Sequence, residues 1–188
     1  MIEHAESWKT EKTDVRGLQT AQKNIIIVGF MGTGKTTVSR LVADRLGWVR
    51  VDTDDEIVRR AGKPIPAIFA NEGEAAFRDL ESRVLARVLA RSGQVVATGG
   101  GAVLREKNRR LMLDGGLVVA LTADRESLIA RVAGGGDAAS RPLLAGDAAE
   151  RIDTLLRTRR NAYDFAHVAI DTTRLSPEEV AEELLSRA

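Results

Sequence analysis

One segment near the start of the chain restricts the fold more than any other feature. Residues 29–36 read GFMGTGKT and match the phosphate-binding pattern G-x-x-x-x-G-K-[ST]. An apolar run, residues 25–28, precedes the motif, and a stretch with helical spacing, residues 35–46, follows it. This context predicts a buried strand, a glycine-rich loop and a helix whose N-terminus binds phosphate.

Each residue type in the motif has a physical reason. The glycines let backbone N–H groups turn inward around a phosphate, Lys35 can reach the β- and γ-phosphates, and the Thr36 hydroxyl can ligate Mg²⁺. The residues we expect to contact ATP are Gly32, Thr33, Gly34, Lys35, Thr36 and Thr37. The motif indicates a nucleotide phosphate but does not identify the acceptor.

The rest of the chain alternates short apolar runs with helical patterns. We predict further strands at 49–52, 95–97, 117–121 and 168–170, and helices at 54–60, 66–71, 74–91, 105–113, 124–132, 148–160 and from Pro177 onward. The alternation predicts an α/β fold with a parallel sheet covered on both faces, which binds ligands at the carboxyl ends of its strands. We interpret residues 1–22 as a flexible tail and residues 23–188 as one domain.

Composition argues against several classes of protein. The chain has no cysteine, which rules out disulfides, thiolate metal sites and cysteine nucleophiles. Its formal net charge of +1 gives no reason to expect nucleic-acid binding, and no apolar run is long enough to span a membrane. The first 22 residues lack the apolar core of a signal peptide. We therefore expect a cytoplasmic protein with neither nucleic acid nor a membrane as partner. We also expect it to act on small molecules as a monomer.

Two carboxylates follow the second predicted strand. Residues i and i+2 of an extended strand face the same side, so Asp52 and Asp54 can enter one cleft. Asp52 is placed to support the Mg²⁺ shell, and Asp54 to accept hydrogen bonds from substrate hydroxyls. A helix N-cap is the alternative role for Asp54.

Two more patterns lie near the expected binding edge. Arg78 and Glu81 are i, i+3 neighbours on a predicted helix, so Glu81 can pin the guanidinium as a clamp for a carboxylate. An ordinary surface ion pair is the alternative. Gly99, Gly100 and Gly101 directly follow the third predicted strand, where we expect the backbone to approach a ligand closely; a flexible loop is the alternative.

A segment rich in glycine and alanine, residues 133–147, separates two predicted helices. We interpret it as a lid that carries Arg141 to the transferred phosphoryl group, with a plain surface loop as the alternative. Arg159 and Tyr163 follow the next helical stretch, where a solvated charge is the default interpretation of an arginine.

Taken together and in this order, the motifs from residue 23 to the end resemble those of shikimate kinases. The specific part is the combination of Asp-x-Asp, Phe-Arg-x-x-Glu, Gly-Gly-Gly and Arg-Pro-Leu-Leu. The resemblance implies a P-loop NTPase-type three-layer sandwich with a five-stranded parallel sheet in the order 2-3-1-4-5. It also implies transfer of the γ-phosphoryl of ATP to the 3-hydroxyl of shikimate, in aromatic amino acid biosynthesis, with Mg²⁺ as cofactor.

The resemblance also implies roles for individual residues. Lys35, Asp54 and Arg141 would be catalytic, Thr36 and Asp52 would serve the metal, and Arg141 and Pro177 would join the motif in binding ATP. The implied substrate-binding residues are Asp54, Phe69, Phe77, Arg78, Gly99, Gly100, Gly101 and Arg159.

Some points stay open at this stage. Residues 159–163 read RRNAY where the family usually has Arg-x-Pro-Leu-Tyr, so Arg160 is a rival to Arg159, and contact of Arg131 with adenine is undecided. A kinase for gluconate or a nucleotide, and a non-catalytic nucleotide-binding module, are the alternative functions.

Overall fold

The fold is built on one parallel sheet. The structure is a computed structural model that describes residues 24–134, 148–159 and 161–188. Its five strands lie in the order β2-β3-β1-β4-β5, and each neighbouring pair is parallel. They are β1 (Asn24–Gly29), β2 (Val49–Asp52), β3 (Gln94–Ala97), β4 (Leu117–Thr122) and β5 (Val168–Asp171). The predicted three-layer α/β fold and strand order are confirmed.

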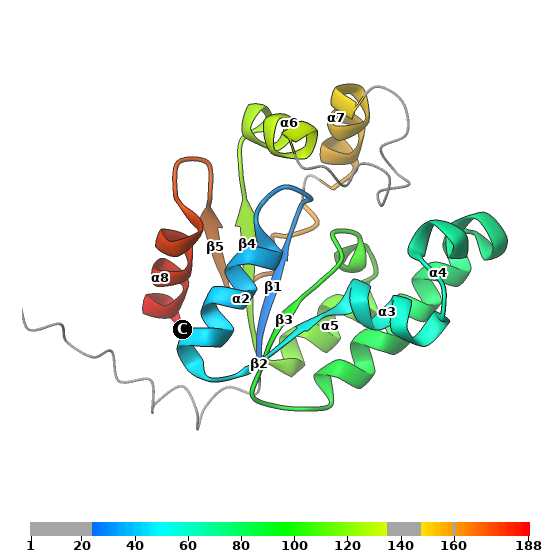
Figure 1. Ribbon diagram of the computed structural model, residues 1–188, viewed down its shortest axis with the longest axis horizontal. Coiled ribbons are helices and arrows are strands. Elements are labelled where there is room, and N and C mark those ends of the chain that lie inside the picture. The colour runs from blue at the N-terminus through cyan, green and yellow to red at the C-terminus, as the bar shows by residue number, and fades with distance from the viewer. Residues whose placement is uncertain (1–23, 135–147, 160) are drawn as a thin grey trace, which may run out of the picture.

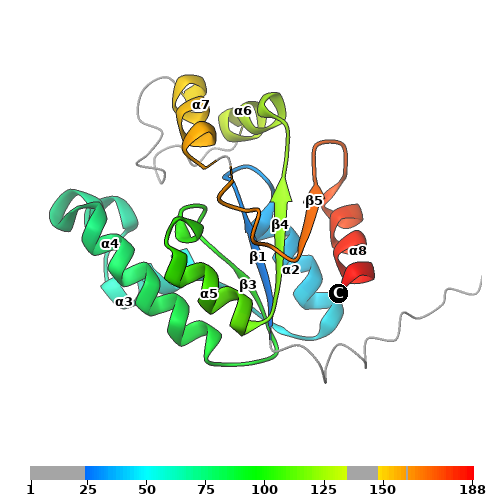
Figure 2. The same ribbon diagram turned by 180° about the vertical axis from the view of Figure 1, so that it is seen from behind.

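Helices cover both faces of the sheet (Figures 1 and 2). One face carries α2 (Lys35–Leu46) and α8 (Pro177–Arg187), and the other carries α4 (Ile65–Leu89) and α5 (Glu106–Gly115), with α3 (Thr53–Ala61) packed against α4. A short 3₁₀ turn, η1 (Ala102–Leu104), links β3 to α5. The two remaining helices, α6 (Arg125–Gly134) and α7 (Ala148–Thr158), pack together beyond the carboxyl end of β4 (Figure 1).

The central strand shows why its sequence is continuously apolar. Ile25 and Ile27 pack in a core cluster with residues of α2 and α8, whereas Ile26 and Val28 pack in a second cluster with residues of α4 and α5. Successive side chains of a strand point to opposite faces, so a sheet covered on both sides needs apolar residues at every position. This burial fixes β1 rigidly and so positions the loop that follows it.

The predicted helices at 66–71 and 74–91 form one element with a break. The structure assigns both to α4, but Gly73 within it has φ 81° and ψ 171°, which is not helical. Glycine suits this place because the positive φ is unfavourable for a residue with a Cβ. The first turns of α4 therefore change direction relative to the long second part, which carries Phe77, Arg78 and Glu81.

Some sequence predictions fall outside the described residues. These are the N-terminal tail, nearly all of the proposed lid with Arg141, and Arg160. Within the described ranges, no helix is both long and apolar enough to cross a membrane.

Candidate active site

A cleft of about 510 Å³ lies where the carboxyl ends of β1, β2 and β3 meet the start of α2 and the middle of α4. Most of the predicted site residues that the structure describes line this cleft. They are Gly32, Gly34, Lys35, Thr36, Thr37, Asp52, Asp54, Phe69, Phe77, Arg78, Gly99, Gly100, Gly101 and Arg159. Of the predicted residues in the described ranges, Thr33 and Pro177 do not line the cleft.

The phosphate-binding loop is closed by its own polar groups. The ammonium of Lys35 donates hydrogen bonds to the carbonyl oxygens of Gly29 (2.9 Å) and Phe30 (2.8 Å). The buried hydroxyl of Thr33 donates to the same Phe30 carbonyl at 2.8 Å. Thr33 therefore shapes the loop with its side chain. Gly34, at φ 92°, caps α2 in a left-handed conformation that favours glycine.

Asp52 is engaged by two protein donors. Its Oδ1 accepts from the backbone N–H of Asp54 at 3.1 Å, which makes Asp52 the N-cap of α3. The alternative that gave the N-cap role to Asp54 is therefore wrong. Oδ2 accepts from the Arg50 guanidinium at 3.0 Å, and Arg50 also donates to Ser39 of α2 at 3.1 Å. These bonds fix the carboxylate beside the phosphate-binding loop.

Asp54 lies in an electrostatically unfavourable place for an anion. Burial and, to a smaller extent, the neighbouring charges of Asp52 and Glu81 raise the pKa of Asp54 to about 6, with Lys35 acting in the opposite direction. Asp52 also has a raised pKa, mainly because it is buried. Two carboxylates with raised pKa values in one cleft favour a cation there.

The oxygen groups around the loop fit Mg²⁺. Thr36 and Asp52 line the same cleft, and both offer the oxygen ligands that Mg²⁺ prefers. The described residues contain no group of three or more His, Cys, Asp or Glu side chains that could hold a metal. Such a group is not required for Mg²⁺, because this ion usually keeps several waters, binds substrate phosphates and takes only one or two ligands from the protein. Because both Asp52 oxygens already accept protein hydrogen bonds, this carboxylate suits the water shell of such an ion.

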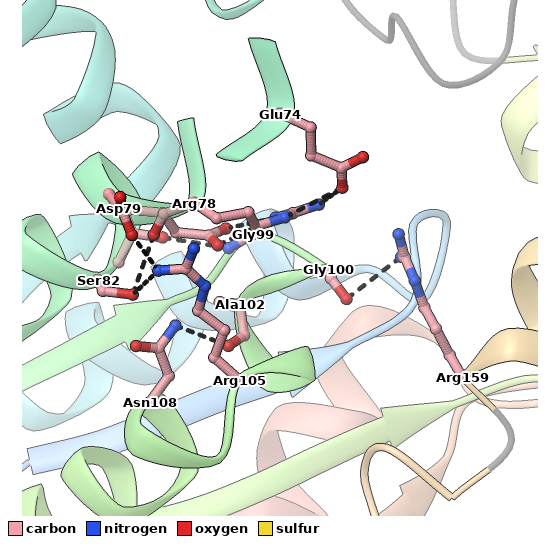
Figure 3. Close-up of polar contacts among 12 residues, drawn as sticks. Glu74, Arg78, Asp79, Ser82, Gly99, Gly100, Ala102, Arg105, Asn108 and Arg159 are labelled. Atoms are coloured by element: carbon pink, nitrogen blue, oxygen red, sulfur yellow. Dashed lines mark hydrogen bonds and ion pairs between the residues drawn. The ribbon is translucent and has the colours of Figure 1, made fainter. Parts of the chain in front are cut away.

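Arg78 is held rigidly, as the sequence predicted. Its Nη1 donates to both carboxylate oxygens of Glu81 (3.1 and 3.0 Å), and its Nε and Nη2 approach Glu74 at 3.4 and 3.3 Å (Figure 3). Arg78 is 8% exposed and Glu81 only 1%, so an ordinary surface pair is excluded. The guanidinium also lies 5.1 Å from the Phe77 ring centroid, and Phe77 contacts Phe69 at 4.5 Å between ring centroids.

The three consecutive glycines are explained by the side chains beside them. A Cβ at Gly99 would lie 2.6 Å from Oδ1 of Asp54, and a Cβ at Gly101 would lie 2.5 Å from both terminal nitrogens of Arg78. At Gly100 a Cβ would lie 3.3 Å from the carbonyl oxygen of Gly29 and 3.4 Å from Arg159 Nη1. The glycines therefore let the backbone lie against the polar side chains of the cleft and against the phosphate-binding loop, and its close approach to a ligand stays a prediction.

Residues 99–101 form the glycine loop, and Arg159 lies across this loop from Arg78 (Figure 3). It follows α7, is only 4% exposed, and donates from Nη1 to the Gly100 carbonyl at 3.2 Å. Its Cζ is 5.6 Å from the Phe30 ring centroid, and its buried Nε has no hydrogen-bond partner among the residues that the structure describes. The default interpretation of a solvated charge is wrong here. An unsatisfied buried donor costs about 1–3 kcal/mol, which an anionic ligand would remove.

Several contributors were not singled out from the sequence. Glu74 holds Arg78, and Arg50 holds Asp52; the latter could have been found because the two residues are i, i+2 on one strand. Arg131, whose contact with adenine the sequence left open, lines the cleft and donates to the carbonyl of Thr172 at 2.7 Å and, more weakly, to that of Gly32 at 3.4 Å. It therefore ties the phosphate-binding loop to the loop before α8. Pro177 is exposed at the start of α8.

Comparisons with known proteins agree on one family. A family model described as shikimate kinase matches residues 31–188. A shikimate kinase of Gloeobacter violaceus is 48% identical over 163 residues, which cover 86% of this chain and 90% of that protein. One of Moorella thermoacetica is 47% identical over 161 residues, with 86% and 91% covered.

Solved structures point the same way. Shikimate kinase from Acinetobacter baumannii in complex with shikimate matches with a TM-score of 0.85 and 37% identity, over 92% of this chain and 95% of that one. Shikimate kinase from Aquifex aeolicus matches with a TM-score of 0.73 and 33% identity, over 87% and 94%. A gluconokinase from Sinorhizobium meliloti has a TM-score of 0.55 but only 19% identity, so it shares the fold alone. With the family model covering most of the chain and relatives this similar, the chain belongs to the shikimate kinase family.

Proposed function

We propose that the cleft transfers the γ-phosphoryl group of ATP to the 3-hydroxyl of shikimate, the reaction of the family to which this ATP-dependent kinase belongs. The observation that carries the assignment of roles is the placement of two buried arginines, Arg78 and Arg159, across the glycine loop from each other beside a phosphate-binding loop. Shikimate has one carboxylate and three hydroxyls, so it needs guanidinium donors at one end and acceptors at the other.

Arg78 and Arg159 bind the carboxylate, and Phe69 and Phe77 wall the ring. Asp54 accepts hydrogen bonds from ring hydroxyls. Support comes from the Glu81 contacts that leave Arg78 little freedom, and from Arg159 Nε, which is buried and has no hydrogen-bond partner within the described part of the chain, so that its N–H can serve the carboxylate. Gly99, Gly100 and Gly101 permit these side chains to lie against the backbone, which brings main-chain groups close to the acceptor.

The nucleotide side uses the phosphate-binding loop. Backbone N–H groups of residues 32–37 and the α2 N-terminus bind the phosphates, and Lys35 exchanges its loop carbonyls for phosphate oxygens. Thr36 and Asp52 would hold Mg²⁺ and its waters, and the ion, when bound, neutralises charge on the phosphates. Arg141 would stabilise the transferred phosphoryl and Pro177 would flank adenine. Arg141 is outside the described residues, and Pro177 does not line the cleft.

Asp54 is the residue that aims the attack. Phosphoryl transfer depends mainly on positioning and charge stabilisation, so the acceptor hydroxyl must face the γ-phosphorus. Asp54 lies between the phosphate-binding loop and the glycine loop, within the electrostatic reach of both Lys35 and Glu81. A carboxylate there accepts the hydroxyl proton or holds the hydroxyl in line. Its raised pKa makes it a better proton acceptor than an ordinary aspartate.

Residues 23–188 form the catalytic domain, with a lid at about 133–147, and residues 1–22 are dispensable for the reaction. The metal is Mg²⁺, and the enzyme works as a monomer in the cytoplasm, where ATP is its co-substrate.

The test is product identification with purified protein. The protein is incubated with ATP and Mg²⁺ and with shikimate, gluconate or a nucleoside monophosphate, and ADP release is followed. Two-dimensional ¹H–³¹P NMR then locates the phosphate on the product. Of the three acceptors, we expect only shikimate to give rapid ADP release, and we expect its product to carry the phosphate ester at the 3-oxygen. Faster turnover with gluconate or a nucleotide than with shikimate would contradict the proposal. So would a rate of ADP release that is the same with and without an acceptor.

A further inference from the structure

Tyr163 contacts the glycine loop of the site, although it does not line the cleft. Its phenol hydroxyl donates to the carbonyl oxygen of Gly100 at 3.0 Å, and Arg159 donates to the same oxygen at 3.2 Å. The ring of Tyr163 is half-buried and packs against the core cluster beneath α4 and α5. It is not among the residues that line the cleft. The hydroxyl is thus held by a packed ring and directed at the loop that contacts both proposed clamp arginines.

We propose that Tyr163 is a positioning residue of the acceptor site, which acts by fixing the Gly100 carbonyl together with Arg159. The inference rests on the proposed function, because it assumes that Arg159 binds the acceptor carboxylate. It adds a residue whose effect is confined to acceptor binding and does not extend to ATP.

The Gly100 carbonyl matters for acceptor binding because it shares a peptide group with the Gly101 N–H. A carbonyl oxygen has two lone pairs, and Arg159 and Tyr163 supply one donor for each. Because the peptide is planar, fixing the carbonyl also fixes the direction of the Gly101 N–H. Among the described residues no hydrogen bond from this N–H is found, so it is a donor open to a ligand.

The orientation of the Gly100–Gly101 peptide affects both arginines. Nη1 of Arg159 is anchored on the Gly100 carbonyl, and the next residue, Gly101, lies against the Arg78 guanidinium. Rotation of the Gly100–Gly101 peptide would therefore shift the support of both side chains. Glycine has unusual backbone freedom, so three consecutive glycines need outside anchors to hold one conformation. Tyr163 is such an anchor and leaves the arginine's Nε available.

Tyr163→Phe removes the hydroxyl and keeps the ring that packs in the core. We expect the Kd for shikimate, measured by calorimetry without nucleotide, to rise about 3- to 10-fold, the size of one net hydrogen bond. The Kd for ATP should stay within about twofold, and the melting temperature should change little. Thr158→Val is the matched control, because it also removes a hydroxyl that donates to a carbonyl near Arg159, namely that of Leu155 (3.0 Å), without touching Gly100. It should leave both affinities unchanged.

A double-mutant cycle tests the shared carbonyl. Independent residues give losses of kcat/KM that multiply within about twofold, whereas coupled ones do not. We expect Tyr163→Phe combined with Arg159→Ala to depart at least threefold from the product of the single losses. Normal shikimate affinity in Tyr163→Phe, equal losses for ATP and shikimate, or independent losses would overturn the inference. If the unmodified protein does not bind shikimate at all, the proposed function itself fails, and the inference with it.

Discussion

Gly101→Ala perturbs the proposed carboxylate clamp without removing any of its polar groups. The added Cβ would lie 2.5 Å from Nη1 and Nη2 of Arg78 and 2.7 Å from its Cζ. Comfortable contacts begin at about 3.5 Å, so the guanidinium must move by roughly 1 Å. Its bonds to Glu81, now 3.0 and 3.1 Å long, cannot survive such a shift. A displaced guanidinium no longer meets the shikimate carboxylate correctly, and the loss of one charged hydrogen bond to that carboxylate costs about 1.5–3 kcal/mol.

The expected result is a loss of shikimate affinity of about 10- to 150-fold, at about 1.4 kcal/mol per decade. Calorimetric titration with shikimate and with ATP, each alone, measures it, and the ATP affinity should stay unchanged. Gly115→Ala at the end of α5 is the control, because the Cβ there would meet the side chain of Leu89 at 3.3–3.4 Å and Gly115 does not line the cleft. Gly101→Ala protein that binds shikimate as tightly as the control would refute the argument that this glycine exists to admit Arg78.

Three further predictions concern other parts of the chain. Lys35→Ala should abolish turnover while the protein stays folded by circular dichroism; near-normal ADP release would contradict the phosphate assignment. Asp54→Asn should stabilise the metal-free protein in EDTA at pH 7.5 by about 1–3 kcal/mol, since a carboxyl with its pKa raised to about 6 costs stability when ionised. This gain, measured by denaturant unfolding, should disappear as the pH falls through 6 toward the ordinary value of 3.8, and a gain that grows toward low pH would reverse the argument. Deleting residues 1–20 should leave kcat/KM within a few-fold, because that stretch has no apolar pattern; a large loss would show that it contributes to the site.

Much of the fold was predictable because its pattern is local. The apolar run before the phosphate-binding loop predicted β1, and the helical spacing of 35–46 matched α2 at both ends, since Gly47 caps that helix in a left-handed conformation. Gly73 separated two predicted helices where the structure has a break. Strand order depends on contacts distant in sequence, and only the resemblance to shikimate kinases supplied it.

The site was predictable where neighbours in sequence make the contact. Arg78 and Glu81 are three residues apart on one helix, so their pairing followed from helix geometry. The hydrogen bonds of Arg159 and Tyr163 to Gly100 join residues 59 and 63 positions apart, and no local pattern encodes them. The roles of Arg141 and Pro177 stay predictions.

The most direct test of the central claim compares shikimate with its methyl ester, which lacks the carboxylate charge. If Arg78 and Arg159 bind that charge, kcat/KM for the acid should exceed that for the ester by at least about 30-fold, since leaving buried charged groups unpaired costs about 2–5 kcal/mol. In Arg78→Ala the ratio should fall by at least about tenfold. Arg78→Lys should not restore it, because an ammonium lacks the planar fork. An ester that reacts as well as the acid, or a ratio that Arg78→Ala leaves unchanged, would contradict the account.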